Sequence, residues 1–164
     1  HRLGRRDPVV SRDALGLEIL EEQRDGYALS TDPARVDVDR VHGWLTSSYW
    51  SPGVSREVVA RSLARSVVVS VHQGATQVGF GRAVTDAATF AWVADVVVDE
   101  ASRGRGLGRW MVGALQSLPE LAGLRRWLLA TRDAHGVYAQ LGFAPLEGTE
   151  SWMAIERVRI GEGA

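Results

Sequence analysis

The chain contains no cysteine. This excludes disulfide bonds, thiolate metal ligands and a cysteine nucleophile, and therefore any mechanism through an acyl-cysteine intermediate. The sequence also lacks an apolar run of about eighteen residues, the length that indicates a membrane-spanning helix. Residues 1–16 lack the apolar segment of a secretory signal. We interpret them as a flexible leader or an expression remnant, and we expect a cytoplasmic location.

An excess of charge of one sign is missing as well, because the formal net charge at pH 7 is −1. No general basic field attracts nucleic acid, so we expect none as a partner. Histidine is sparse, and no His-Glu-x-x-His segment occurs, so we expect no metal site. The composition is that of a globular protein, 45% hydrophobic and 24% charged. Without repeats or linkers, it predicts a single domain over residues 17–160.

A glycine-rich turn joins an apolar segment to an amphipathic one. A strand predicted over residues 89–98 is followed by Arg103-Gly104-Arg105-Gly106-Leu107-Gly108 and by a helix predicted over residues 107–118. This order presents backbone N–H groups to a phosphate, and the helix adds the positive end of its dipole. Glycine lets the backbone approach a ligand closely, and arginine supplies charge-assisted hydrogen bonds. The segment therefore predicts a phosphate-bearing ligand, the alternative being a plain strand–helix turn.

The common phosphate motifs do not fit this turn. The chain has no Gly-x-x-x-x-Gly-Lys followed by Ser or Thr. Arg109 occupies the position of the third glycine in the Rossmann pattern Gly-x-Gly-x-x-Gly. What remains, Arg-Gly-x-Gly-Leu-Gly after an apolar strand, resembles the acyl-CoA pyrophosphate loop of the GNAT superfamily of acetyl-CoA-dependent N-acetyltransferases, Arg/Gln-x-x-Gly-x-Gly/Ala.

A second segment strengthens the resemblance. Residues 134–143, Ala-His-Gly-Val-Tyr-Ala-Gln-Leu-Gly-Phe, resemble the second GNAT signature, Ala-x-x-x-Tyr-x-x-x-Gly-Phe. They follow a buried strand predicted over residues 127–131. A short helix is predicted over residues 134–141, with Asp133 as its N-cap and Gly142 at its C′ position. The two signatures stand in the order that the family has.

The resemblance covers roughly residues 17–157 and implies the GNAT fold. This is an α/β (mixed α+β) architecture, with a twisted mixed sheet of about six to seven strands flanked by about four helices. Periodicity and turn signals give the order β-α-α-β-β-β-α-β-α-β-β. The remaining predicted elements are a strand over 17–29 interrupted near Asp25-Gly26, a helix beginning at Thr31-Asp32-Pro33 and running to Leu45, a helix capped by Ser55 and ending near Arg65, a hairpin of 66–71 and 77–85, and a last strand over 151–157.

The resemblance also implies acetyl-CoA as co-substrate. In the family it lies where two parallel strands splay apart, here residues 89–98 and 126–131, and it pairs with the backbone of the first. A backbone N–H there polarises the thioester carbonyl. Thr131 stands where many members have Asn. The implied cofactor-binding residues are Val96, Val97, Val98, Arg103, Gly104, Arg105, Gly106, Leu107, Gly108, Arg109, Thr131 and His135.

Two residues are candidates for catalysis. Tyr138 occupies the tyrosine position of the second signature, from which the resemblance implies that the phenol protonates the departing CoA thiolate. Its alternative role is to anchor the short helix. Asp95 is a charged residue in an apolar strand, with its side chain pointing opposite to that of Val96. It is either a base or an anchor for the substrate ammonium, or one half of a structural ion pair with an arginine.

The acceptor side is predicted around four aromatic residues, Trp44, Tyr49, Trp50 and Trp92. They either line a pocket that holds a cationic amine by cation–π contact or pack in the core. The leading prediction is transfer of an acetyl group to a primary amine of a small molecule or peptide, by direct attack in a ternary complex. Two alternatives stay open: a non-catalytic acyl-CoA-binding regulatory domain, and an enzyme that acetylates a protein or an aminoacylated RNA. Dimers are common in the family, so a homodimer is also an expectation.

Overall fold

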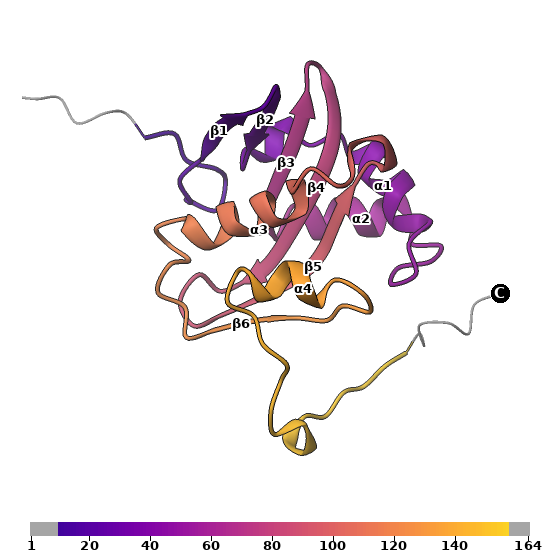
Figure 1. Ribbon diagram of the computed structural model, residues 1–164, viewed down its shortest axis with the longest axis vertical. Coiled ribbons are helices and arrows are strands. Elements are labelled where there is room, and N and C mark those ends of the chain that lie inside the picture. The colour runs from indigo at the N-terminus through magenta and orange to yellow at the C-terminus, as the bar shows by residue number, and fades with distance from the viewer. Residues whose placement is uncertain (1–9, 158–164) are drawn as a thin grey trace, which may run out of the picture.

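The computed structural model describes residues 10–157, which form a six-stranded sheet with helices on both faces (Figure 1). The strands lie in the sheet in chain order. Neighbours from β1 to β5 are antiparallel, and β6 runs parallel to β5. The predicted fold class is confirmed. The strands are β1 Glu21–Arg24, β2 Tyr27–Ser30, β3 Val67–Gln73, β4 Thr76–Thr85, β5 Phe90–Val98 and β6 Arg126–Leu129.

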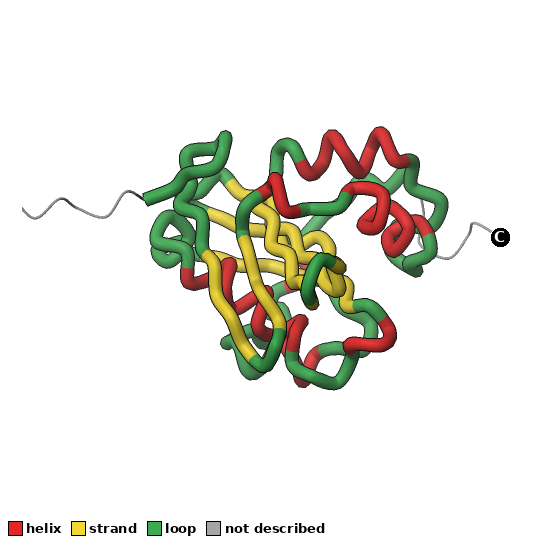
Figure 2. The backbone as a smooth tube through the Cα atoms, turned by 90° about the horizontal axis from the view of Figure 1, so that it is seen from above, coloured by secondary structure: helices red, strands yellow, loops and turns green. Residues whose placement is uncertain are grey.

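The helices form two layers, one on each face of the sheet (Figure 2). Helices α1 (Val38–Thr46) and α2 (Arg56–Leu63) enclose one apolar cluster with Val68 and Phe80 of the sheet. Helix α3 (Leu107–Ser117) packs in the larger cluster on the other face. Alternate residues of β3 enter the two clusters, because side chains of a strand point to opposite faces. The shorter α4 (His135–Ala139) follows β6.

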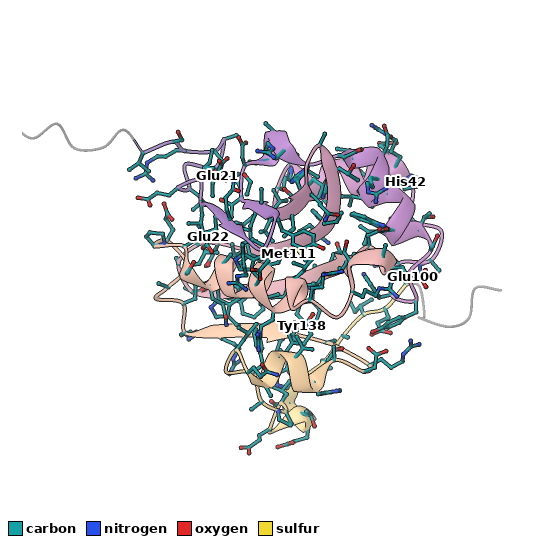
Figure 3. All side chains as sticks on the ribbon, turned by 45° about the horizontal axis from the view of Figure 1, so that its top comes forward. Glu21, Glu22, His42, Glu100, Met111 and Tyr138 are labelled. Atoms are coloured by element: carbon teal, nitrogen blue, oxygen red, sulfur yellow. The ribbon has the colours of Figure 1, made fainter. Side chains whose placement is uncertain are left out.

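Two glycines in β4 allow close contacts with neighbouring side chains, one from β3 in the same sheet and one from α3 above it. A Cβ on Gly81 would lie 2.9 Å from Cγ1 of Val69, and one on Gly79 would lie 3.2 Å from Cε of Met111. Met111 is fully buried and lies near the centre of the molecule (Figure 3). The stiff Val69 side chain leaves no room for a Cβ at Gly81, whereas a Cβ at Gly79 would require the end of the Met111 side chain to shift.

Local capping signals are confirmed at two turns. The Ser55 hydroxyl accepts a hydrogen bond from the Val58 N–H at 3.2 Å and caps α2. Asp86 organises the β4–β5 turn, where Oδ1 accepts from the N–H groups of Thr89 at 2.8 Å and Ala88 at 2.9 Å. These bonds, led by the one from Thr89, hold the pKa of Asp86 well below its usual range. Asp86 is therefore a turn residue and not part of a site.

The segment predicted as one interrupted strand over residues 17–29 forms two separate strands in the structure. The structure has a hairpin there, with β1 and β2 paired antiparallel across Asp25-Gly26. Both turn residues have positive φ, 51° and 82°. Two residues of left-handed conformation reverse the chain between short strands, so the interruption seen in the sequence is the turn itself.

The helix predicted from Pro33 is wrong in its extent. Asp32 caps a single 3-10 turn over Pro33–Arg35, and the backbone then becomes extended at Val36. Asp37 caps a new helix, α1, by accepting from the Arg40 N–H at 3.1 Å. The second aspartate supplies its own cap, so the chain begins a second helix in place of extending the first.

The strand predicted over residues 151–157 is also wrong. The structure has a 3-10 turn over Thr149–Ser151, and the chain that follows is extended but has no strand partner. It lies clear of the sheet (Figure 1). An alternating sequence pattern indicates a strand only where the chain meets an edge with which to pair, and within the described residues this segment meets none.

Candidate functional site

Strands β5 and β6 separate half-way along β5. Parallel pairing ends at Val93 and Leu129, where β6 stops, while β5 continues to Val98 against β4. Ala94 is an extra residue between the pairs Arg82–Asp95 and Ala83–Val93, a β-bulge of the kind that bends a strand. The edge of residues 96–98 that faces away from β4 therefore has no neighbouring strand. Amide groups of a ligand can pair with this free edge in β fashion.

The glycine-rich turn leads directly from this edge into α3. Gly104 and Gly106 have φ of 77° and 74°, a conformation that glycine adopts at little cost. Gly106 is the N-cap of α3 and makes no side-chain cap bond. The N–H groups of the first helical turn, from Leu107 to Arg109, consequently lack the usual capping acceptor. Free N–H groups and the positive end of a helix dipole are the features with which helix N-termini bind anions.

Three arginines surround this helix end. Arg103 Nε donates to the Val98 carbonyl at 3.2 Å, which links the turn to the free edge of β5. The guanidinium of Arg109 donates to the side-chain oxygen of Gln140, which follows α4. Arg105 is exposed. Positive charge at a helix N-terminus is unfavourable in itself, and a bound anion would compensate it.

Helix α4 ends as the signature residues predict. The N–H groups of Phe143 and Gly142 donate to the carbonyls of Tyr138 and Ala139, at 3.2 and 3.1 Å. This is a Schellman motif with Gly142 at C′, where its φ is 92°. The rings of Phe143 and Tyr138 meet edge to face, with centroids 5.9 Å apart. The motif therefore holds the Tyr138 ring in place on a very short helix.

Tyr138 is half-buried, and its environment keeps the phenol neutral. Burial raises the pKa of Tyr138 above its ordinary value of 10.0, and the nearby Tyr49 hydroxyl adds a smaller contribution in the same direction. The phenol is therefore protonated at neutral pH, the form that a general acid requires. The side chain lies on the α4 side of the molecule (Figure 3).

The α4 start differs from the prediction. Asp133 does not cap the helix, because Ala134 is the N-cap residue and its N–H donates to Thr131 Oγ1 at 3.1 Å. The Asp133 carboxylate instead lies 3.7 Å from the guanidinium of Arg132. The Thr131 hydroxyl thus has a structural partner in this structure. His135 is exposed in the first turn of α4.

Asp95 lies in a buried polar cluster. Its Oδ2 accepts from Arg82 Nε and its Oδ1 accepts from Trp50 Nε1, both at 2.8 Å. Only 5% of Asp95 is exposed. Arg82 also donates to the Ser66 hydroxyl at 3.1 Å. This geometry corresponds to the structural ion pair, one of the two roles that the sequence left open, and both carboxylate oxygens are engaged.

The aromatic residues do not form one pocket. Tyr49 and Trp50 meet edge to face, with centroids 5.0 Å apart. Trp44 and Trp50 both pack against the α1–α2 cluster, and the Arg40 guanidinium lies 4.9 Å from the ring centre of Trp44. Trp92 is half-buried in β5. No hydrogen bond or ring contact joins Trp92 to the other three within the part of the chain that the structure describes.

Arg132 is a residue that the sequence did not single out. Its guanidinium lies 4.0 Å from the centre of the Tyr49 ring, and its backbone N–H donates to the Tyr49 hydroxyl at 3.3 Å. Arg82 was missed in the same way, although a lone charge in the apolar strand β4 is the counterpart of Asp95 in β5. Gln140, the partner of Arg109, had no sequence signal. The α1–α2 loop, the end of β6 and α4 are thus joined around Tyr49.

A cavity of about 730 Å³ lies against β6 and α4. Thr131, His135 and Tyr138 line it, but residues 96–98 and the glycine-rich turn do not. It therefore contains two of the predicted cofactor-binding residues, Thr131 and His135, and none of the others. Among residues 10–157, no group of three or more His, Asp or Glu side chains is placed to hold a metal ion. None of the described helices combines the length and apolarity needed to cross a bilayer.

Comparison with known proteins identifies the family. The model of the acetyltransferase (GNAT) domain matches residues 64–145, a range that includes the glycine-rich turn and Tyr138. A candidate acetyltransferase of Gibberella zeae is 31% identical, over 67% of this chain and 74% of that protein.

Solved structures agree with this assignment. A candidate GNAT acetyltransferase from Xanthomonas campestris has a TM-score of 0.78 at 35% identity, covering 85% of this chain and 98% of the other. A candidate acetyltransferase from Deinococcus radiodurans, 22% identical with a TM-score of 0.65, shares the fold over 84% of this chain and 94% of its own. The chain therefore belongs to the GNAT acetyltransferase family.

Proposed function

We propose that this protein transfers the acetyl group of acetyl-CoA to a primary amine of a small molecule or peptide, in a ternary complex and without a covalent enzyme intermediate. The observation that carries the proposal is the continuity of three features: the free edge of residues 96–98, the uncapped start of α3 and the neutral phenol of Tyr138. A cytoplasmic location is part of the proposal.

The residues present fit the donor. The N–H groups of residues 107–109, with Arg105 and Arg109 beside them, would hold the pyrophosphate. The backbone of Val96 to Val98 would pair with the pantetheine amides, and a backbone N–H of this stretch would polarise the thioester carbonyl. Arg103 would release the Val98 carbonyl that it now contacts. The bound donor supplies an activated acetyl thioester.

Tyr138 would donate its phenolic proton to the departing thiolate sulfur. A raised pKa keeps this proton in place at neutral pH, and the Schellman motif fixes the ring. The attacking nitrogen, positively charged in the tetrahedral intermediate, would lose a proton to solvent as the amide forms, and the tyrosinate left behind would recover a proton from solvent. Direct attack of the amine nitrogen on the carbonyl carbon suits a chain without cysteine.

Asp95 is proposed to act as a positioning residue. It holds the Trp50 indole, which in turn contacts the Tyr49 ring. The Tyr49 ring lies beside Arg132, and Tyr49 contributes to the raised pKa of Tyr138. Asp95 would thus position Trp50 and Tyr49, and the acceptor amine would approach beside these two rings. The amine must be neutral to attack, since an ammonium has no lone pair, and its ordinary pKa is about 10.4.

A CoA-release screen tests the proposal. Purified protein and acetyl-CoA are incubated with amines, amino acids, polyamines, arylamines and peptides, and free thiol is measured. All 19 basic side chains of this chain are arginine, so acetylation of its own lysines cannot produce thiol. We expect amine-dependent release that Tyr138→Phe reduces. Saturable acetyl-CoA binding without release for any amine would contradict transfer and favour the non-catalytic alternative.

A further inference from the structure

The guanidinium of Arg132 is held in solvent on an aromatic support. It lies over the Tyr49 ring at 4.0 Å from the ring centre, and the backbone N–H of Arg132 donates to the Tyr49 hydroxyl at 3.3 Å. The Arg132 side chain is nevertheless 66% exposed. A guanidinium over the face of a ring keeps its N–H groups free for a planar partner that accepts two hydrogen bonds. Arg132 is therefore a positioned cation with unused donors.

The protein itself engages this cation weakly. Within residues 10–157 the guanidinium makes no hydrogen bond, and its ion-pair partner is the adjacent Asp133, with nitrogen and oxygen 3.7 Å apart. The Asp133 side chain is also exposed, at 69%. An ion pair between two exposed side chains contributes little and is screened by salt. A carboxylate that accepts two N–H bonds from the guanidinium would displace Asp133.

Arg132 stands beside the proposed reaction centre. Strands β5 and β6 separate beyond Val93 and Leu129, and Arg132 follows soon after the end of β6. Tyr49 connects the cation to the proposed general acid, because the Tyr49 hydroxyl is near enough to Tyr138 to contribute to the raised pKa of that residue. A small molecule whose anionic end is held by Arg132 would thus lie along the Tyr49 ring, toward Tyr138.

We propose that the acceptor is an aminocarboxylate, in the simplest case an amino acid, and that Arg132 binds its carboxylate; this inference rests on the proposed acetyl transfer. The planar fork of one guanidinium matches a carboxylate. With Asp133 beside it, Arg132 suits a single negative charge better than the double charge of a phosphate. Arg132 is then a specificity-determining residue, which selects among amines by a group that does not react.

Pairing with Arg132 also helps the amine to lose its proton. In a free amino acid the carboxylate stabilises its own ammonium group, because a nearby opposite charge favours the charged form. Arg132 compensates the carboxylate and removes that stabilisation, so the amine becomes neutral more readily. This effect matters at a site where both oxygens of Asp95 are already engaged by Trp50 and Arg82.

Paired acceptors test the inference. Amino acids with a primary amine are each compared with their α-amides, which keep the amine and the side chain and lack the negative charge. Thiol release is measured with wild type, Arg132→Gln and Arg61→Gln. Arg61 is a matched control, because its side chain is 70% exposed and lies 4.0 Å from the Glu57 carboxylate on α2. We expect Arg132→Gln to raise KM for the acid about tenfold or more and to leave KM for the amide close to the wild-type value, and Arg61→Gln to change neither.

An equal rise of KM for acid and amide in Arg132→Gln would reduce Arg132 to a structural support of Tyr49 and overturn the inference. Use of uncharged amines or phosphoethanolamine in preference to every amino acid would overturn it too, and acetyl transfer would stand. Calorimetry of the same amino acids with the CoA-loaded protein adds a readout without turnover. Binding that depends on Arg132 but gives no thiol release would support the carboxylate site and contradict the proposed transfer.

Discussion

The indole of Trp50 donates a hydrogen bond of 2.8 Å to the carboxylate of Asp95. This contact ties the loop after α1 to the middle of β5, just beyond the bulge at Ala94 where β5 leaves β6. The carboxylate also holds Arg82 of β4. One buried group therefore fixes both the aromatic loop and the strand that carries the proposed donor site.

Removal of Asp95 should therefore destabilise the fold. We expect Asp95→Ala to lower the free energy of unfolding by about 3–5 kcal/mol, because the Arg82 guanidinium, 16% exposed, loses its charged partner. Urea unfolding measures this. Asp39→Ala is the control, since its ion pair with Arg56 is exposed and should contribute little to stability.

The same residue separates positioning from base catalysis. Asp95→Asn keeps an acceptor for Trp50, so we expect the shape of the pH–rate profile to be retained while KM for the amine rises. Trp50→Phe should raise KM in the same way, because it releases the loop. If the Asp95→Asn variant no longer showed the fall in rate at low pH that the protonation of a base produces, Asp95 would be a base after all.

Tyr138→Phe should reduce kcat by about a hundredfold or more while the acetyl-CoA dissociation constant changes little. The phenyl ring preserves the contact with Phe143 and removes only the proton donor. Steady-state kinetics and calorimetric binding measure the two quantities. Near-normal turnover would leave Tyr138 with the anchoring role alone.

Tyr138 also affects stability at high pH. Its folded-state pKa is raised, so its contribution is fully present below the unfolded pKa of about 10 and is lost as the pH rises through the folded value. Wild type should thus lose more stability than Tyr138→Phe above pH about 10. Equal losses in the two proteins, measured by urea unfolding, would contradict this.

The glycine-rich turn should be sensitive to a single methyl group. At Gly106, with φ of 74°, an alanine is strained by about 1–2 kcal/mol, so the turn relaxes and its N–H groups move. We expect Gly106→Ala to weaken acetyl-CoA binding about tenfold, since about 1.4 kcal/mol corresponds to that factor. Gly43→Ala, in open space on α1 and without positive φ, should bind normally.

Gly81→Ala should destabilise the core by about 1–3 kcal/mol, because the new Cβ would meet the buried Val69 at 2.9 Å. Thermal unfolding measures the loss. Gly123→Ala adds the same methyl group where nothing lies within 4 Å, and it should be neutral or slightly stabilising. Equal unfolding temperatures for the two variants would contradict the idea that Gly81 is needed for the close packing of β3 and α3.

His72 should make the protein sensitive to mild acid. Burial, and secondarily the charge of Arg35, lower its pKa below 6.5, against a weaker opposite effect of Asp37. Its contribution to stability is present above the unfolded pKa and is lost as the pH falls through the lower folded value. Urea unfolding at pH 7 and pH 5 should show a smaller pH effect in His72→Gln than in wild type.

Part of the site followed from local sequence. The glycine-rich turn, the Schellman motif around Gly142 and the Ser55 cap depend on backbone conformation and on hydrogen bonds between residues a few positions apart. Short-range patterns encode such features completely. The misplaced Asp133 cap shows the limit, since Thr131 accepts from the Ala134 N–H and α4 begins one residue later than the capping pattern predicts.

The sequence by itself predicted the elements from the second helix to α4, the glycine-rich turn, the place of Tyr138 and the resemblance to a family, because each rests on local spacing of residue types. Tertiary structure alone decided that Arg82 and Trp50 occupy both oxygens of Asp95, that Arg132 lies on Tyr49, and that residues 152–157 leave the sheet. Those relationships join residues 13 to 83 positions apart. Such contacts depend on packing and on the available strand edges, which no local pattern contains.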